Sequence, residues 1–114
     1  MTATLTFEET SRTAKAGDIS LHYNEAGDGP VLVMLHGGGP GASSWSNFKQ
    51  NLPGLSEHFR VLLVDQPGYG KSDKPVVTEP FWTYSARAVR SLLDELGIEK
   101  AHFVGNSLGG GTTL

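Results

Sequence analysis

The chain contains no cysteine, which excludes disulfide bonds and thiolate metal sites. A formal net charge of only −3 gives no electrostatic reason to expect nucleic acid or an anionic membrane as a partner. The first residues lack the basic and apolar stretches of a secretory signal, and no apolar run approaches membrane-spanning length. We therefore expect a cytoplasmic protein in which residues 1–114 form part of one domain.

What the chain does have is 15 glycines, several of them placed directly after apolar runs. The runs 31–35 and 60–64 are continuously apolar or nearly so, which is typical of strands buried on both faces. Apolar residues at helical spacing predict a helix over 81–96, with Gly97 as its C-terminal cap. A short apolar run, 101–104, predicts a third strand. This alternation of strands and helices indicates a mostly parallel α/β sheet.

The N-terminal third is more polar. Alternating apolar and polar residues predict two strands, over 5–10 and 19–24, joined by a turn at 16–18. Their polar positions indicate an antiparallel ribbon at the sheet edge rather than a buried centre. Further on, a short helix is expected to open at 43–48, and residues 53–54, Pro-Gly, are expected to interrupt the helical pattern.

The segment Gly105-Asn106-Ser107-Leu108-Gly109 follows the last predicted strand. Gly-x-Ser-x-Gly after a strand is typical of a nucleophile elbow, a strand-to-helix turn that holds its serine in a strained backbone conformation. Glycine is needed on both sides because Cβ atoms there would collide as the turn closes. The pattern predicts that Ser107 is a nucleophile. The alternative is a strand followed by a glycine-rich loop that happens to contain serine.

A second loop, His36-Gly37-Gly38-Gly39-Pro40-Gly41-Ala42, follows the strand 31–35. Loops at the carboxyl ends of neighbouring parallel strands meet at one edge of the sheet, so this loop is expected over Ser107. Acyl chemistry needs two N–H donors where the carbonyl oxygen becomes negative. The Leu108 N–H would supply one donor and the glycine loop the other, since a side chain would fill the space of the oxyanion.

The glycines admit two other interpretations. Residues 37–42 satisfy the loose pattern Gly-x-Gly-x-x-Ala of a dinucleotide-binding turn, which stays open as an alternative. Against it, Pro40 intrudes where N–H groups should point at a phosphate, and the acidic residue Asp65 comes late. Residues 70–72, Gly-Lys-Ser, resemble the end of a phosphate-binding loop. That interpretation fails because Asp65 occupies the position of the required first glycine.

Together these motifs resemble the N-terminal part of an α/β-hydrolase, and closely that of the meta-cleavage product hydrolases, which break carbon–carbon bonds in aromatic and steroid ring degradation. The resemblance is carried by residues 36–47, His-Gly-Gly-Gly-Pro-Gly-Ala-Ser-Ser-Trp-Ser-Asn, and by residues 105–112, Gly-Asn-Ser-Leu-Gly-Gly-Gly-Thr. It covers nearly all of the chain and looks most like the steroid branch, whose substrate is a ring-opened seco-steroid dienoate. Biphenyl-type relatives share many of the same residues.

The resemblance implies an α/β-hydrolase fold that is present here up to the nucleophile elbow, and an enzyme without a metal or organic cofactor. It implies that Ser107 attacks the ketone of a 2-hydroxy-6-oxo-dienoate after ketonisation, while Gly38 and Leu108 donate the oxyanion hydrogen bonds. It further implies that the polar end of the dienoate is bound by Asn47, Asn106 and the backbone of Gly39. From the residues alone, Asn47 could equally cap or decorate a helix, Asn106 could be a turn residue, and the glycines could form a flexible loop.

The histidines are not arranged as a metal site, since no pair has ligand spacing. His22 and His58 are expected on the surface or on a strand face, His102 on the elbow strand below the site, and His36 in a structural role. In this fold the acid and base of the triad follow the nucleophile in the order Ser, Asp, His. Only seven residues follow Ser107.

We therefore expect this chain to be the first piece of a longer polypeptide and not a stable enzyme alone. The elbow strand is expected to leave an apolar sheet edge unpaired. The expected partners are a small-molecule dienoate, the remainder of the polypeptide with its Asp and His, and further copies in a dimer or tetramer. Two other functions stay open, a general serine esterase and a non-catalytic relative. A haloalkane-type enzyme is disfavoured because it would place Asp at position 107.

Overall fold

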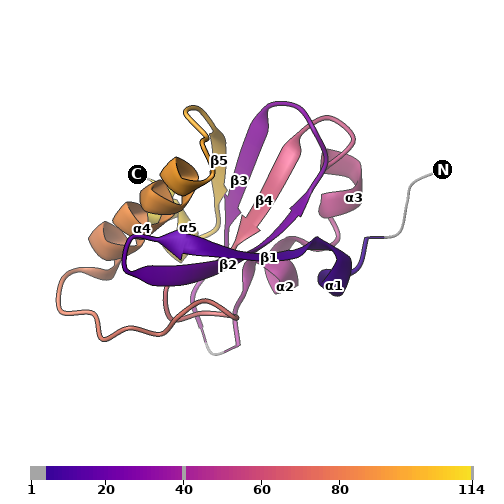
Figure 1. Ribbon diagram of the computed structural model, residues 1–114. Coiled ribbons are helices and arrows are strands. Elements are labelled where there is room, and N and C mark those ends of the chain that lie inside the picture. Colours follow the sequence, from indigo (N-terminus) through magenta and orange to yellow (C-terminus); the bar gives the residue numbers. More distant parts are fainter. Residues whose placement is uncertain (1–4, 40, 114) are drawn as a thin grey trace.

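The computed structural model describes residues 5–39 and 41–113, which form a five-stranded sheet with helices on both faces (Figure 1). In chain order the elements are α1 (Phe7–Thr10), β1 (Ser11–Ala16), β2 (Ile19–Ala26), β3 (Val31–Leu35), α2 (Ser44–Phe48), α3 (Leu52–Leu55), β4 (Arg60–Val64), α4 (Phe81–Glu95), β5 (His102–Gly105) and α5 (Leu108–Thr113). The strand order is β1-β2-β4-β3-β5. Strand β3 pairs in parallel with β4 and β5, while β2 pairs antiparallel with β1 and β4. The predicted parallel sheet with an antiparallel N-terminal ribbon is confirmed.

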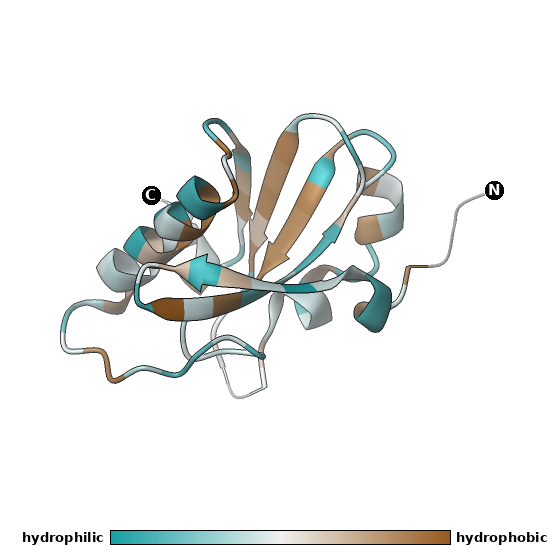
Figure 2. Cartoon of the chain, viewed as in Figure 1, coloured by the Kyte–Doolittle hydropathy of each residue, from teal (hydrophilic) through white to brown (hydrophobic). Residues whose placement is uncertain are grey.

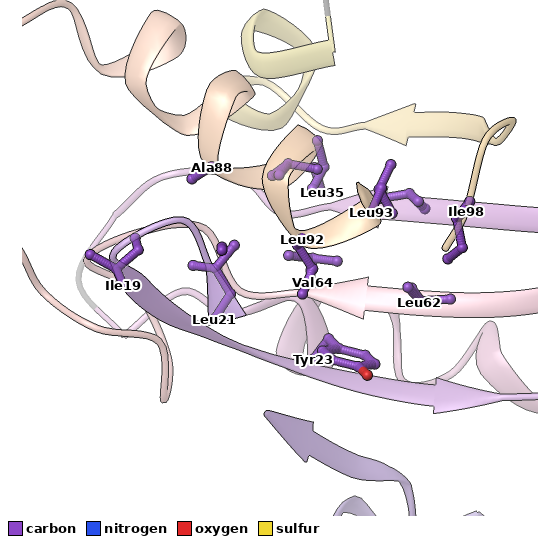
Figure 3. Packing of buried hydrophobic residues seen from close by; sticks show 13 residues of the cluster. Ile19, Leu21, Tyr23, Leu35, Leu62, Val64, Ala88, Leu92, Leu93 and Ile98 are labelled. Atoms are coloured by element: carbon purple, nitrogen blue, oxygen red, sulfur yellow. The ribbon is translucent and has the colours of Figure 1, made fainter. Parts of the chain in front are cut away.

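The neighbouring strands β3 and β4 each supply side chains to two separate cores. This burial on both faces explains their almost continuous apolar sequence, which is brown over most of both strands in Figure 2. Side chains alternate across a strand, so Val33 and Leu35 of β3 face α4, whereas Leu32 and Met34 face α2 and α3. The helix α4 covers the first face with Ala88, Val89, Leu92 and Leu93 (Figure 3). This arrangement holds β3 between β4 and β5, and its carboxyl end carries the glycine loop.

The N-terminal ribbon differs from the sequence prediction in two respects. Residues 7–10 form the helix α1 rather than a strand, because the Thr6 hydroxyl accepts a hydrogen bond from the Glu9 N–H at 3.1 Å and caps the helix. The alternation of apolar and polar residues over 5–10 therefore does not indicate a strand here. The ribbon does lie at the sheet edge, as predicted, but β2 is more buried than expected: it pairs with both β1 and β4, and Leu21 and Tyr23 are buried against α4.

The prediction that Pro53 and Gly54 interrupt a helix is also wrong, since both lie inside the short helix α3. Proline is tolerated there because the N–H groups of the first helical turn have no partner within the helix. The predicted cap at Gly97 is confirmed. Gly97 follows Leu96, the C-cap residue of α4, and its φ of +71° is typical of a glycine that ends a helix.

Strand β5 forms the sheet edge, as predicted, and within the described residues it pairs only with β3. Phe103 and Val104 of β5 are 39% and 43% exposed. A hollow of about 690 Å³ lies beside the beginning of β5 and reaches Val31 at the beginning of β3. Substrate sites in such sheets lie at the opposite, carboxyl ends of the strands, so this hollow is a property of the uncovered edge.

Candidate active site

Ser107 lies in a sharp turn between β5 and α5, and its side chain is exposed. Its φ of +52° places it in the left-handed region, where no other non-glycine residue of 5–39 and 41–113 is found. A Cβ atom at Gly105 would overlap the carbonyl oxygen of Gly109, and one at Gly109 would overlap the carbonyl oxygen of Leu35. The strained serine and the two crowded glycines are the geometry of a nucleophile elbow.

The glycine loop leaves the end of β3 and passes beside Leu108, the residue after the serine. A Cβ atom at Gly38 would lie 3.3 Å from Cδ2 of Leu108 and 3.5 Å from the hydroxyl oxygen of Tyr69. Gly39 has a φ of +119°, which favours glycine, and a Cβ there would meet nothing within 4 Å. In 5–39 and 41–113 neither the Gly38 N–H nor the Leu108 N–H has an acceptor. The loop thus brings one unoccupied donor, the Gly38 N–H, close to Leu108, whose own N–H is the second.

Asn47 and Asn106 come from different elements and meet next to this loop. The Oδ1 atom of Asn47 accepts hydrogen bonds from the Gly37 N–H at 3.0 Å and from Nδ2 of Asn106 at 3.1 Å. Asn47 does not cap α2, because Ser43 and Ser46 form the capping box of that helix. The polar residues that the sequence singled out therefore converge on the backbone of the glycine loop.

His36 lies under the loop and is fully buried. Its Nδ1 atom lies 2.7 Å from the Gly37 carbonyl oxygen, and its Nε2 accepts the Gln66 N–H at 3.0 Å. Burial lowers the pKa of the His36 ring, against smaller opposing effects of the Gly37 carbonyl and the Asp65 carboxylate. With both ring nitrogens occupied, His36 supports the loop and has no free nitrogen with which to act as a base.

Residues 30–114 match the family described as the alpha/beta hydrolase fold. The chain belongs to the α/β-hydrolase family. It is 51% identical over 116 residues to the 2-hydroxy-6-oxo-6-phenylhexa-2,4-dienoate hydrolase of Comamonas testosteroni, an alignment that covers 96% of this chain and 41% of that protein. It is 50% identical over 95 residues to a 2-hydroxy-6-oxononadienedioate/2-hydroxy-6-oxononatrienedioate hydrolase of the same species, covering 82% of this chain and 33% of the relative.

Among solved structures, this α/β-hydrolase chain is similar to the 2-hydroxy-6-oxo-6-phenylhexa-2,4-dienoate hydrolase from Rhodococcus sp. strain RHA1. The TM-score is 0.84 at 37% identity, over 90% of this chain and 39% of the other. The resemblance to meta-cleavage product hydrolases is therefore confirmed. The chain spans only about 41% of the length of the first relative.

The α/β-hydrolase chain also contains a buried polar cluster that the sequence did not reveal. His22 was expected on the surface or on a strand face; it lies on strand β2, and only 1% of it is exposed. Its Nε2 lies 2.7 Å from the Ser11 hydroxyl, and its Nδ1 lies 2.8 Å from Oδ2 of Asp65. The Asp65 carboxylate also accepts the backbone N–H of Ser44 at 3.0 Å. This cluster ties the ribbon to α2 and to the end of β4.

Gln66 is a second residue that sequence reasoning missed. It is fully buried directly behind the glycine loop, and its only sequence signal is a polar residue at the end of an apolar strand. The remaining histidines, His58 and His102, are exposed, and His102 opens β5 whereas Ser107 follows the end of that strand. Over the described ranges there is no group of three metal-ligating side chains. No helix in those ranges could cross a membrane.

Proposed function

We propose that the full-length protein hydrolyses a carbon–carbon bond in a 2-hydroxy-6-oxo-dienoate, with Ser107 as its nucleophile. The observation that carries this proposal is the position of Ser107, which is exposed in a left-handed turn beside the unoccupied N–H groups of Gly38 and Leu108. The substrate class is supported by the names of relatives 50–51% identical to this chain.

In the proposed reaction the dienol first becomes the ketone form. Ser107 then gives its proton to a base while its Oγ bonds to the carbonyl carbon, and the carbonyl electrons move onto oxygen. The Gly38 and Leu108 N–H groups bind this oxyanion. When the carbonyl re-forms, the bond to the neighbouring chain carbon breaks, its electron pair leaves with the dienoate fragment, and the protonated base returns its proton to that fragment. Water then hydrolyses the acyl-serine to a carboxylic acid and free Ser107, so no redox partner is needed.

The polar end of the dienoate is proposed to bind at Asn47 and Asn106, with the backbone of Gly39 lining the same space. In the described part of the chain Oδ1 of Asn47 is engaged, but its Nδ2 group donates no hydrogen bond. That amide therefore offers donors to a carboxylate or an enol oxygen. Asn106 donates one hydrogen bond to Asn47 through its Nδ2, and its side-chain oxygen is left as an acceptor.

The base and acid of the triad are proposed to come from the remainder of the polypeptide. Both ring nitrogens of His36 and of His22 are occupied by other groups, so neither can accept the Ser107 proton without losing a buried partner. The relatives extend well beyond the matched region, which leaves room for a lid and for both residues.

The group on the far side of the scissile bond is proposed to be a seco-steroid, on the sequence resemblance to the steroid branch. The first relative is instead named for a phenyl dienoate. A substrate panel separates the two: the proposal expects the higher kcat/KM with the seco-steroid dienoate, and a preference for the phenyl dienoate would overturn this part of it.

The full proposal is tested by following loss of dienoate absorbance with the purified full-length protein. We expect turnover that Ser107→Ala lowers by about 10⁴-fold or more. Ser56→Ala serves as the matched control, because Ser56 lies after α3 and its hydroxyl donates only to the Pro53 carbonyl. Hydrolysis of simple aryl esters without any dienoate cleavage would instead identify a general serine esterase.

A further inference from the structure

We infer that Gln66 is a positioning residue, whose backbone and side chain together aim the Gly38 N–H at the oxyanion. This inference rests on the proposed function for its kinetic consequence but not for its geometry. Gln66 contacts the loop at two points: its N–H donates to Nε2 of His36 at 3.0 Å, and its Nε2 donates to the His36 carbonyl at 2.9 Å.

The backbone contact selects the tautomer of His36. Because Nε2 accepts the Gln66 N–H, the proton of the neutral ring must sit on Nδ1, which then donates to the Gly37 carbonyl at 2.7 Å. A protonated ring would carry a hydrogen on Nε2 that faces the Gln66 N–H. The groups facing the ring are Tyr69, whose ring centroid lies 4.8 Å away, and the charged Asp65 nearby.

The orientation of Gly38 follows from the planarity of one peptide unit. The Gly37 carbonyl and the Gly38 N–H belong to the same trans peptide and point in opposite directions. Since His36 holds that carbonyl underneath the loop, the Gly38 N–H is directed to the other side of the peptide. Gly38 lies against Leu108 there. A flip of this single peptide would replace a donor with a carbonyl oxygen.

The Gln66 side chain locks the preceding peptide as well. In the unit between His36 and Gly37, the carbonyl accepts from Gln66 and the N–H donates to Asn47. On its other side, Oε1 of Gln66 accepts from Ser85 of α4 at 3.0 Å and from Thr112 of α5 at 2.5 Å. Gln66 thereby joins the glycine loop to the helix that begins at the nucleophile elbow.

Two substitutions separate the contact to the loop from the anchoring to the helices. Gln66→Met removes every side-chain hydrogen bond at similar length. Gln66→Glu keeps acceptors for Ser85 and Thr112, but it loses the donor to the His36 carbonyl and sets a carboxylate oxygen against it. If the contact to His36 positions the loop, both variants lower kcat by about 10- to 100-fold with KM changed less than about threefold. Rescue of kcat by Glu relative to Met would overturn the inference.

A spectroscopic measurement on the full-length protein does not depend on activity. Nitrogen–proton correlation spectra of the histidine rings should show His36 protonated at Nδ1, and both Gln66 variants should shift the Gly38 amide resonance. A proton on Nε2 of His36, or an unmoved Gly38 resonance, would overturn the inference even if the enzyme hydrolyses dienoates. Conversely, absence of dienoate turnover in the parent protein would reject the proposed function and leave this measurement to decide the role of Gln66.

Ile98→Val is the control for a general loss of stability, because Ile98 is a buried core residue beyond the far end of α4. In this variant kcat should stay within about twofold of the parent value. The chemical shift of the Gly38 amide should stay within one line width of its position in the parent protein. If Ile98→Val reproduced the kinetic effect of Gln66→Met, the effect would be one of folding, and the inference would be wrong.

Discussion

The side-chain amide of Asn106 donates a hydrogen bond to Oδ1 of Asn47 across 3.1 Å, and so joins two residues 59 positions apart in the chain. The same Oδ1 accepts the N–H of Gly37. One oxygen atom therefore links the residue before the proposed nucleophile to the loop that carries the proposed oxyanion donor. Because this oxygen is occupied, the proposed contact of Asn47 with substrate must come from its Nδ2 group.

Asn47→Asp separates the structural role of Oδ1 from the proposed substrate contact of Nδ2, because aspartate keeps an acceptor oxygen and replaces the donor group with a negatively charged carboxylate oxygen. We expect an unfolding free energy close to that of the parent protein. The KM for the dienoate should rise about tenfold or more, since a carboxylate repels an anionic substrate. Asn47→Ala is the matched variant: it leaves the Gly37 N–H without its partner and should cost about 1–3 kcal/mol of unfolding free energy. A KM unchanged in Asn47→Asp would restrict Asn47 to a structural role.

Ser107→Gly is expected to be more stable than Ser107→Ala, although both lack the hydroxyl of the proposed nucleophile. The φ of +52° strains any residue with a Cβ atom. Glycine removes this strain, and the relief is larger than the extra conformational entropy that glycine loses on folding. The expected net difference is about 1 kcal/mol, measured by urea unfolding of the two full-length variants. Equal stabilities would mean that the turn stores no backbone strain at residue 107.

The elbow and the glycine loop could be predicted from the sequence because their requirements are local. Gly105 is needed because a Cβ there would overlap the Gly109 carbonyl within the turn itself, and the continuous apolar run of β3 is needed wherever a strand is covered on both faces. Gly109 fits the same short pattern, although the atom that excludes a Cβ there is the Leu35 carbonyl oxygen of β3.

The buried polar contacts could not be predicted, because their partners are distant in the chain. His22 meets Asp65 across 43 positions, and Gln66 meets Thr112 across 46. A polar residue at a strand end is compatible with both solvent and a buried network, and only the packed sheet decides between them. The helix α1 was missed for a different reason, since the cap formed by Thr6 and Glu9 outweighed a weak alternating pattern.

Gly109→Ala and Gly110→Ala form a matched pair that tests the packing of the elbow. A Cβ at position 109 would overlap the Leu35 carbonyl, whereas at position 110 the nearest atom is the Gly105 carbonyl oxygen at 3.5 Å, an ordinary contact. We expect Gly109→Ala to cost about 3 kcal/mol or more. Gly110→Ala should be neutral or stabilise the helix α5 by up to about 1 kcal/mol. Thermal and urea unfolding measure both, and equal tolerance at the two positions would contradict the elbow geometry.

His36 should make stability depend on pH in a definite direction. Burial lowers its pKa in the folded protein below the ordinary value of 6.5 that it regains on unfolding. Between these two pKa values the unfolded chain binds a proton that the folded chain does not, so stability rises with pH across this window. The stabilisation is complete above about pH 6.5 and is lost as the pH falls from there through the lowered pKa.

His36→Asn should unfold more easily at pH 8 but lose less stability on acidification, as measured by melting temperature against pH. His58→Asn is the control, because His58 is exposed and its replacement should leave the slope of the parent protein unchanged. Parallel pH profiles for His36→Asn and the parent would show that the ring beneath the glycine loop is not held neutral.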